Sequence, residues 1–275
     1  MKISVIVTTY NRPDALKKVL DGLLYQTRLP DEIIIADDGS DNDTKSIIRP
    51  YFQNQQVCIK HVWQEDIGFR AAWIRNKAIF ASTGEYLLLL DGDCVPGKYF
   101  VRDHMDLAQK GCFFQGKRVV VKKSVEQIFN RTNCNSTARL IIHTLKNEIS
   151  NSHHIIRIPF FPSYKVKKLS GIRSCNMGVF RDDIFAVNGF NHAFKGWGRE
   201  DSELVVRLFK YGLKRNENPF RAICFHLWHD ESTRDSLERN DEILKETLRS
   251  ESFSCKSGLN DIIEQPFNFT ESGDG

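Results

Sequence analysis

The sequence predicts an α/β fold, a single domain with two lobes in which a mostly parallel sheet carries helices on both faces. The first hundred residues alternate short apolar segments with amphipathic ones. Several of the apolar segments, such as EYLLLLDGD (85–93), are apolar on both faces. Strands that are buried on both sides and separated by helices are typical of a parallel sheet covered by helices. The 275 residues suffice for one large domain of this kind.

The expected elements follow from hydrophobic periodicity and from helix start and stop signals. We expect strands over 4–10, 32–40, 57–63, 85–93, 112–121, 174–180 and 221–229. We expect helices from Pro13 through Leu23 and over 70–82, 99–110, 136–149, 182–188, 200–212 and 233–248. A further short helix is expected to run through Ile47 and Ile48. Ser40 or Asp41 is a candidate cap for the second helix. The polar stretch 251–275 is expected to be a mobile tail.

Charge is unevenly distributed along the chain. The net charge is only +4, but the segment 115–168 has eleven Lys or Arg and two Glu, a local charge of +9. We call these residues the basic segment. Such a concentration indicates a surface that meets an anionic partner, with a solvated basic face as the alternative.

Composition also limits the setting in which the protein works. No apolar run approaches the roughly 20 residues that cross a bilayer, and MKISVIVTTYN lacks a cleavage site for a leader. The seven cysteines form no CxxC pair, so they predict neither a zinc site nor a disulfide framework. Reduced thiols and a cytoplasmic location are the simplest expectation.

Polar clusters follow three of the expected strands. They are Tyr10-Asn11-Arg12, Asp37-Asp38-Gly39-Ser40 and Asp91-Gly92-Asp93. Ligands of open α/β sheets bind outside the carboxyl ends of the strands. The sequence therefore predicts a binding site at this edge of the sheet.

Asp91 and Asp93 are candidates for holding a divalent cation. Two carboxylates on either side of a glycine allow a diphosphate to approach the metal closely. The alternative is a polar turn that closes a strand, but the other two clusters make a cation site the better interpretation. His226 and His229 form an H-x-x-H pattern, and neutral imidazole suits Mn²⁺, so either could complete the site. Histidines without a metal are the alternative.

Further candidates surround these clusters. Asp38 could accept a hydrogen bond from a base N–H, although DDGSDND is also turn chemistry. Arg70 and Arg75 could face a diphosphate or lie exposed on a helix. Glu200 and Asp201 open a helix after Trp197, so one of them could deprotonate a hydroxyl, with helix capping as the alternative.

Several motifs together resemble a known family. SVIVTTYNRP, IIIADDGSDN and RNKAIFASTGEYLLLLDGD resemble family 2 glycosyltransferases of the GT-A (Rossmann-like) fold. GFNHAFKGWGREDSEL and FHLWH resemble the galactosyltransferase-like C-terminal part of chondroitin-polymerase-type enzymes and β-1,4-galactosyltransferases. The resemblance covers about residues 1–235.

The resemblance implies a role for each matching residue. Thr8, Tyr10 and Arg12 would line the nucleotide, Asp38 would contact uracil, and Arg70 would lie near the base or diphosphate. Asp91 would face the ribose or the metal, and Asp93 would bind the metal with His226 or His229. Trp197 would shape the sugar pocket, Glu200 would hold acceptor hydroxyls, and Asp201 would be the general base. Residues 1–100 would form a nucleotide-sugar-binding lobe and 101–250 an acceptor-binding lobe. Arg199 stands where many relatives have glycine, and the basic segment has no counterpart in the family.

The resemblance implies an inverting glycosyltransferase that uses Mn²⁺ or Mg²⁺. The donor would be a UDP-sugar and the acceptor a glycan or lipid-linked glycan. The transferred group would be a hexose or N-acetylhexosamine, galactose-type, in bacterial surface polysaccharide or lipopolysaccharide synthesis. The basic segment would dock on anionic lipid at the inner membrane face or on a phosphate-bearing acceptor. Two alternatives stay open: a sugar-phosphate nucleotidyltransferase and a basic nucleic-acid-binding module. The second leaves the acidic clusters unexplained.

Overall fold

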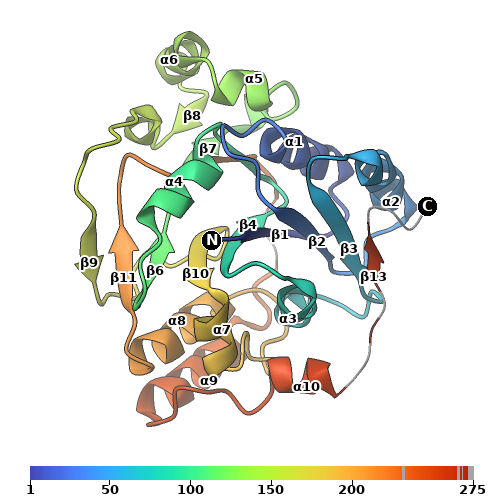
Figure 1. The fold of residues 1–275 in the computed structure, drawn as a ribbon, viewed down its shortest axis with the longest axis vertical. Helices are drawn as coiled ribbons and strands as arrows, with labels where there is room; N and C mark the ends of the chain where they lie inside the picture. Colours follow the sequence, from blue (N-terminus) through green and yellow to red (C-terminus); the bar gives the residue numbers. More distant parts are fainter. Residues whose placement is uncertain (231–232, 265–266, 268, 272–275) are drawn as a thin grey trace.

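The computed structural model describes residues 1–230, 233–264, 267 and 269–271. Its centre is a large sheet with helices on both sides (Figure 1). The α/β class predicted from the sequence is confirmed. In the described part of the chain, no helix is long and apolar enough to cross a bilayer.

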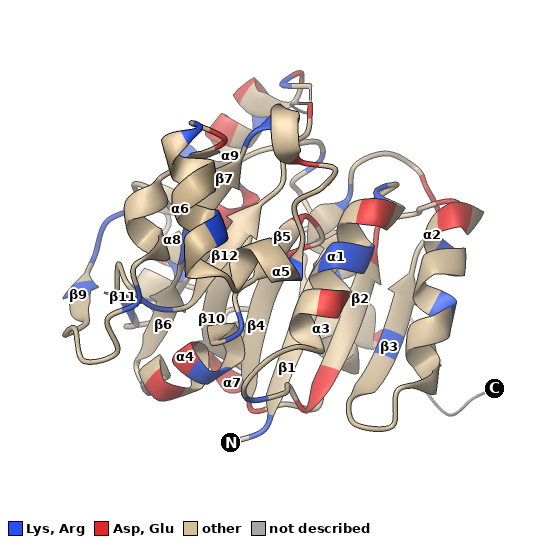
Figure 2. Ribbon diagram, turned by 90° about the horizontal axis from the view of Figure 1, so that it is seen from above, with Lys and Arg blue, Asp and Glu red and all other residues tan. Residues whose placement is uncertain are grey.

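The main sheet crosses the boundary that we predicted between the two lobes. Its strand order is β13-β3-β2-β1-β4-β10-β6-β11-β9, and most of this order can be followed from right to left in Figure 2. The strands are β1 (Ile3–Thr9), β2 (Glu32–Asp37), β3 (Cys58–Trp63), β4 (Tyr86–Asp91), β6 (Cys112–Gln115), β9 (Tyr164–Val166), β10 (Asn176–Phe180), β11 (Lys214–Glu217) and β13 (Phe269–Glu271).

Strand direction differs between the two halves of the main sheet. The strands β1 to β4 of the first hundred residues pair in parallel, as their two-sided apolar pattern predicts. The second half brings antiparallel pairs, because β10 runs against both β4 and β6. The sheet is therefore mixed rather than mostly parallel beyond β4.

A second, smaller sheet has the order β5-β12-β7-β8. Its strands are β5 (Cys94–Pro96), β7 (Lys117–Val121), β8 (Ile149–Ser150) and β12 (Ile223–His226). The late strand β12 lies between β5 and β7, pairing antiparallel with β5 and parallel with β7. This insertion carries His226 to the end of β4, where Asp91 and Asp93 lie.

The helices divide between the two faces of the main sheet. Alternate residues of β1 point to opposite faces, so Val5 and Val7 contact one hydrophobic cluster and Ile6 another. The first cluster includes residues of α1 (Pro13–Leu23), α4 (Phe100–Leu107), α5 (Arg131–Cys134) and α6 (Thr137–Leu145). The second includes residues of α3 (Ala71–Ala81), α7 (Arg181–Ala186), α8 (Glu200–Lys210) and α10 (Leu259–Ile263). The remaining helices are α2 (Asn42–Ile48), α9 (Leu237–Arg249) and the short 3₁₀ turns Arg49–Gln53, Lys123–Val125 and Ser152–Ile155.

The single strand expected over 112–121 is wrong, because the chain breaks at Gly116. Residues before this glycine join the main sheet as β6, and residues after it join the small sheet as β7. A Cβ at Gly116 would lie only 2.2 Å from Oδ1 of Asn176, so the close approach of these two segments requires glycine. The cap at Asp41 is confirmed, since its side chain accepts hydrogen bonds from the backbone of Asp43 and Thr44.

The expectation of a mobile tail is wrong for part of residues 251–275. Leu259 and Ile262 of α10 are buried, and Leu259 packs in the same cluster as α3 and α8. Phe269–Glu271 forms β13, which extends the main sheet beside β3. The physical reason is that two buried side chains and an edge pairing suffice to hold a short segment, and neither produces a visible periodicity.

Candidate active site

The carboxyl ends of β1, β2 and β4 meet at one edge of the main sheet. Thr9 lies opposite Asp37, and Thr8 lies opposite Asp91. The chain turns at Gly92, whose N–H donates to the carbonyl of Thr8 at 2.7 Å. A Cβ at Gly92 would lie 2.9 Å from that carbonyl oxygen, so glycine permits the turn that separates Asp91 from Asp93.

Asp93, His226 and His229 form a cluster suited to a cation. Their ligand atoms all lie within 4.8 Å of one another. Nε2 of His226 is 3.7 Å from Oδ1 of Asp93, and Nε2 of His229 is 3.4 Å from its Oδ2. The N–H of Leu227 donates to the carbonyl of Asp93 at 2.9 Å, which fixes the end of β12 against the turn.

The donor set of this cluster fits the implied divalent metal. One carboxylate and two imidazoles suit Mn²⁺ and similar cations. Burial lowers the pKa of His226 to about 4, so its ring is neutral and has a lone pair to offer. Nδ1 of His226 is buried and has no hydrogen-bond partner among the described residues.

Arg12 lies against the same cluster. Its Nη1 donates to Oδ2 of Asp93 at 2.8 Å, and its Nη2 donates to the carbonyl of Trp228 at 3.0 Å. The arginine that we expected to line the nucleotide therefore contacts the carboxylate that we expected to bind the metal. Its guanidinium neutralises part of the charge that Asp93 carries and links the start of α1 to the segment that follows β12.

Arg75 joins the remaining acidic candidates. This buried side chain of α3 lies 3.4 Å from Asp91, 3.2 Å from Glu200 and 3.8 Å from Asp201. Its Nε also donates to Oγ1 of Thr8 at 3.2 Å. The sequence offered Arg75 as a diphosphate contact or an exposed residue, and its place at the centre of three carboxylates was missed.

The electrostatics of this group follow from its burial. Burial raises the pKa of Asp91 to about 7, against the opposing effect of Arg75. Burial, together with the negative charge of Asp201, raises the pKa of Glu200 above its usual range. Although burial opposes it, the charges of Asp201, Asp91 and Glu200 raise the pKa of Arg75, which keeps the guanidinium charged.

Asp201 has one oxygen held and one oxygen without a hydrogen bond. Its Oδ2 accepts from the backbone N–H of Ser174 at 2.8 Å. Its Oδ1 is buried, has no hydrogen-bond partner among the described residues and lies 3.8 Å from Arg75. A carboxylate fixed through one oxygen can present the other to a substrate proton. Ser174 contributes through its backbone, which leaves no signal in the sequence.

Asp38 lies at the other end of the same edge. It is buried, and its carboxylate accepts from Nε2 of Gln64 at 2.5 Å and from the backbone N–H of Arg70 at 2.8 Å. Burial nevertheless raises its pKa. The Arg70 guanidinium points elsewhere and donates to the carbonyl of Glu65 at 2.5 Å. Tyr10 is exposed and donates to Asp66 at 2.9 Å.

The loop before α8 holds Trp197 at the surface. Asn240 of α9 is fully buried and donates to the carbonyls of Lys195, Trp197 and Gly198 at 3.0–3.4 Å. Sequence reasoning missed Asn240, because an asparagine in a polar helix gives no sign of its buried partners. Arg199, the departure from the family pattern, has φ = 77°, a left-handed conformation that favours glycine.

The predicted residues thus fall into connected groups at one edge of the sheet. Asp93, His226, His229 and Arg12 form one group. Thr8, Asp91, Glu200 and Asp201 meet around Arg75, and we call these five residues the Arg75 group. Asp38 joins them through β1, since its N–H donates to the carbonyl of Thr9 at 3.0 Å. Tyr10 and Trp197 lie at the exposed margin.

Comparison with known families decides what this edge of the sheet belongs to. The family model described as glycosyl transferase family 2 matches residues 4–173, more than half of the chain. The chain belongs to glycosyltransferase family 2. A model described as the N-terminal domain of galactosyltransferase matches residues 154–230 of this family 2 glycosyltransferase. Family membership favours the glycosyltransferase interpretation over the nucleotidyltransferase and nucleic-acid-binding alternatives.

Curated relatives of this glycosyltransferase include a glucosyltransferase and two synthases. It is 27% identical over 230 residues to a validoxylamine A glucosyltransferase of Streptomyces hygroscopicus subsp. limoneus, covering 77% of the chain and 48% of the relative. It is 25% identical to a chondroitin synthase of Escherichia coli, covering 76% and 32%, and 28% identical to a hyaluronan synthase of Pasteurella multocida, covering 76% and 23%. The chain therefore spans about half or less of the length of these relatives.

Solved structures share the fold at low sequence identity. The mannosyltransferase PcManGT from Pyrobaculum calidifontis, in complex with GDP-Man and Mn²⁺, is similar with a TM-score of 0.55 and 17% identity, covering 84% of this chain and 58% of that one. TarS 1-349 from S. aureus has a TM-score of 0.61 and 16% identity, covering 90% and 65%. These similarities show that the fold is of the GT-A type.

Proposed function

We propose that this protein is a metal-dependent, inverting glycosyltransferase that transfers a hexose or N-acetylhexosamine, galactose-type, from a UDP-sugar to a hydroxyl of a glycan acceptor. The observation that carries the proposal is the cluster of Asp93, His226 and His229 beside the Arg75 group. One donor-binding region and one proton acceptor at the same edge are what direct displacement at the anomeric carbon needs.

Different residues would bind the base, the cation and the sugar of the donor. Asp38 offers a buried carboxylate to a base N–H, and the half-buried Thr8 and the exposed Tyr10 would line the nucleotide. Asp93, His226 and His229 would hold the cation, which when bound neutralises charge on the departing diphosphate. Asp91 and Glu200 are fixed by Arg75, and Trp197 offers an exposed aromatic face to a sugar ring.

Asp201 is the proposed general base. Its Oδ1 takes the proton of the acceptor hydroxyl while the hydroxyl oxygen forms a bond to the anomeric carbon. The bond from that carbon to the diphosphate breaks, and its electron pair leaves with UDP. The hydrogen bond from Ser174 to Oδ2 orients the carboxylate for this transfer.

The test is a screen of UDP-sugars for hydrolysis with and without Mn²⁺. We expect Asp93→Asn to lower the rate by about 100-fold or more, because charge on the leaving group loses its stabilisation. Asp43→Asn, which removes an exposed carboxylate of α2, is the matched control and should leave the rate unchanged. Mn²⁺ affinity, measured by electron paramagnetic resonance, should fall in Asp93→Asn alone. Unchanged turnover in that variant would remove the metal assignment.

The setting is a separate part of the proposal. The helix α6, within the basic segment, exposes Ile141, Ile142 and Leu145, and Phe160 of the same segment is 96% exposed. Exposed apolar side chains among lysines and arginines suit an anionic lipid surface, where each cation contributes about 1 kcal/mol. We therefore propose that the enzyme acts at the inner membrane face, on lipid-linked glycans for surface polysaccharide or lipopolysaccharide. Equal sedimentation with anionic and zwitterionic vesicles would exclude this placement.

A further inference from the structure

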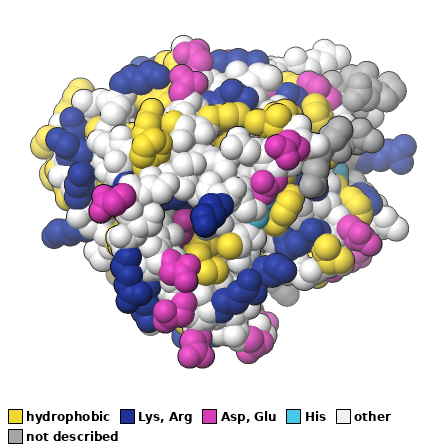
Figure 3. All heavy atoms as spheres, turned by 90° about the horizontal axis from the view of Figure 1, so that it is seen from below, with side chains coloured by type: hydrophobic (Ala, Val, Ile, Leu, Met, Phe, Trp, Pro, Cys, Tyr) yellow, Lys and Arg dark blue, Asp and Glu magenta, His cyan; other side chains and the backbone are white. Residues whose placement is uncertain are grey.

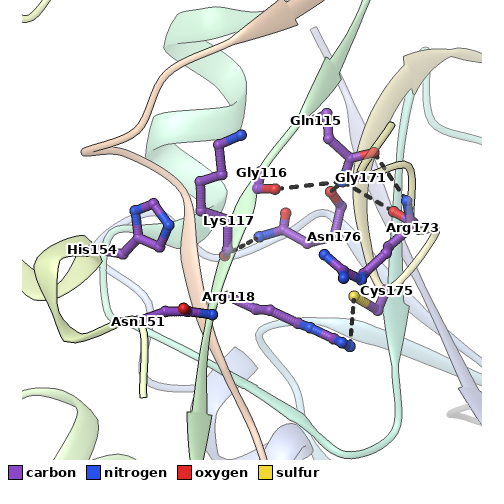
Figure 4. A pocket seen from close by; sticks show the side chains of 10 residues that line it. All are labelled: Gln115, Gly116, Lys117, Arg118, Asn151, His154, Gly171, Arg173, Cys175 and Asn176. Atoms are coloured by element: carbon purple, nitrogen blue, oxygen red, sulfur yellow. Dashed lines mark hydrogen bonds between the residues drawn. The ribbon is translucent and has the colours of Figure 1, made fainter. Parts of the chain in front are cut away.

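A basic cavity lies between β7 and the segment before β10, next to Ser174, which contacts Asp201 of the Arg75 group. Its volume is about 210 Å³, many times the roughly 10–15 Å³ that one water needs. Residues of β6, β7, the turn after β8 and the segment before β10 line it (Figure 4): Gln115, Gly116, Lys117, Arg118, Asn151, His154, Gly171, Arg173, Cys175 and Asn176.

The basic cavity has more positive charge than its surroundings neutralise. Lys117 pairs with Oε2 of Glu217 at 2.5 Å. Arg118 extends from β7 toward Cys175, with its Nη1 3.9 Å from that sulfur (Figure 4). Among the described residues, no carboxylate pairs with the guanidinium of Arg118 or Arg173. Burial lowers the pKa of His154, so the charge comes from the two arginines.

Other polar groups of the basic cavity are already engaged. Nδ2 of Asn176 donates to the carbonyls of Lys117 and Ala222, at 3.0 and 2.8 Å. Gln115 donates to the carbonyls of Arg173 and Asn176. Arg118 is half-buried and Arg173 is exposed. An arginine without a carboxylate partner has fork-shaped donors that match phosphate and carboxylate oxygens. The chemistry of the basic cavity therefore calls for an anion.

The position of the basic cavity relates it to the acceptor. Arg173 and Cys175 flank Ser174, whose N–H holds the carboxylate of Asp201 at 2.8 Å. Consecutive Cα atoms are about 3.8 Å apart, so the lining residues lie one peptide unit from the group that fixes Asp201. The proposed donor contacts, Asp38 and Tyr10, belong to the other end of the sheet edge.

We propose that the basic cavity binds an anionic group, a phosphate or a sugar carboxylate, of the acceptor whose hydroxyl meets Asp201. The proposal rests on the glycosyltransferase function and narrows its acceptor to anionic glycans. Arg118 and Arg173 are the specificity residues. An acceptor that carries a negative charge at one sugar would be held there while a neighbouring hydroxyl reaches Oδ1 of Asp201.

Isothermal titration with small probes tests the proposal on the whole chain. The probes are inorganic phosphate, p-nitrophenyl β-glucuronide and the uncharged p-nitrophenyl β-glucoside. We expect at least one anion to bind more tightly than the glucoside. Arg118→Gln should lower the affinity for that anion by about tenfold or more. Arg139→Gln, which removes an exposed arginine of α6 outside the basic cavity, is the matched control and should bind as the wild type does. The tighter of the two anions identifies the charged group.

Two results would overturn the proposal. One is equal affinity for the anion in Arg118→Gln and wild type, or no preference for either anion over the glucoside. The other is loss of glucuronide binding when UDP and Mn²⁺ are added, which would place the anion at the donor diphosphate. Hydrolysis of UDP-sugar is measured in parallel for the wild type and for the control Arg139→Gln. If the wild type hydrolyses no UDP-sugar but its anion binding still depends on Arg118, the donor assignment fails and the basic cavity stands as an anion site.

Discussion

Replacing Arg75 by glutamine should destabilise the protein strongly, because three carboxylates share this one guanidinium. The pair with Glu200 is 3.2 Å long, and two unit charges at that distance attract by about 5 kcal/mol at an effective dielectric constant of 20. Desolvation of the arginine offsets part of this attraction. Removing one partner of a buried pair costs about 3–5 kcal/mol, since the other charge stays buried. The side chains of Asp91 and Asp201 are 32% and 22% exposed, so water screens them and we take the lower value, about 3 kcal/mol.

Urea unfolding at pH 8 measures the effect. A loss of about 3 kcal/mol corresponds to a fall in melting temperature of roughly 6–12 °C for a chain of this size. The matched control is Arg102→Gln, which breaks an exposed pair with Asp106 on α4 and should cost about 0.5 kcal/mol. A double-mutant cycle adds a second readout: Glu200→Gln should be more stabilising in the Arg75→Gln background than in the wild type. A loss in Arg75→Gln no larger than that of the control, or strict additivity in the cycle, would refute the reasoning.

Two further predictions concern Glu200 and Gly116. Burial raises the pKa of Glu200 in the folded protein above its value of about 4.3 in the unfolded chain. The contribution of Glu200 to stability is therefore greatest below about pH 4.3 and is lost as the pH rises through the pKa of the folded state. Glu200→Gln should therefore unfold at higher urea than the wild type at pH 8, with the difference shrinking toward pH 4.5; a difference that grows on acidification would contradict this sign. Gly116→Ala should cost about 1–3 kcal/mol in thermal unfolding, since its Cβ would meet Asn176 at 2.2 Å, whereas at Gly97 the nearest atom is 3.4 Å away and Gly97→Ala should be tolerated. Equal stability of these two alanine variants would show that the side chain of Asn176 moves away from the added Cβ without a loss of stability.

The edge of the sheet that carries the site could be predicted from the sequence. Strands apolar on both faces indicate a parallel arrangement, and parallel strands place their carboxyl ends together. The sequence alone therefore predicts that Asp38 and Asp91 lie at one edge of the sheet. The convergence of Asp93 with His226 needed more, because β12 reaches Asp93 only by entering between β5 and β7. The sequence shows the H-x-x-H pattern of His226 and His229, but only the family resemblance indicated that these histidines lie at the metal site.

Other features depend on partners that are distant in the sequence. Gly116 breaks a run that reads as one strand, and its reason is the side chain of Asn176. Arg75 lies on a largely buried helix, so no periodicity distinguishes a hub of three ion pairs from an exposed contact. Asn240 is a polar residue in a polar helix, and only the folded loop before α8 reveals the three carbonyls that it binds. Each case is a long-range contact that local pattern does not encode.

Charged side chains of both signs are interspersed on the face seen from the side of α9 and α10 (Figure 3). The basic segment comprises β7, β8, β9, α5 and α6. Its +9 charge is therefore not spread evenly over the molecule. Part of it neutralises acidic neighbours, as Lys117 does for Glu217, and part, through Arg118 and Arg173, lines the basic cavity.

The late arrival of β12 has a consequence for biosynthesis. Arg12 reaches the carbonyl of Trp228 across 216 residues of sequence, and β5 and β7 have β12 as a shared neighbour. A nascent chain that has not yet emerged from the ribosome as far as His226 has two unpaired strand edges and an incomplete cation cluster. Such edges invite pairing with other chains. Prematurely terminated products should thus be recognised by chaperones and proteases rather than persist as partial enzymes.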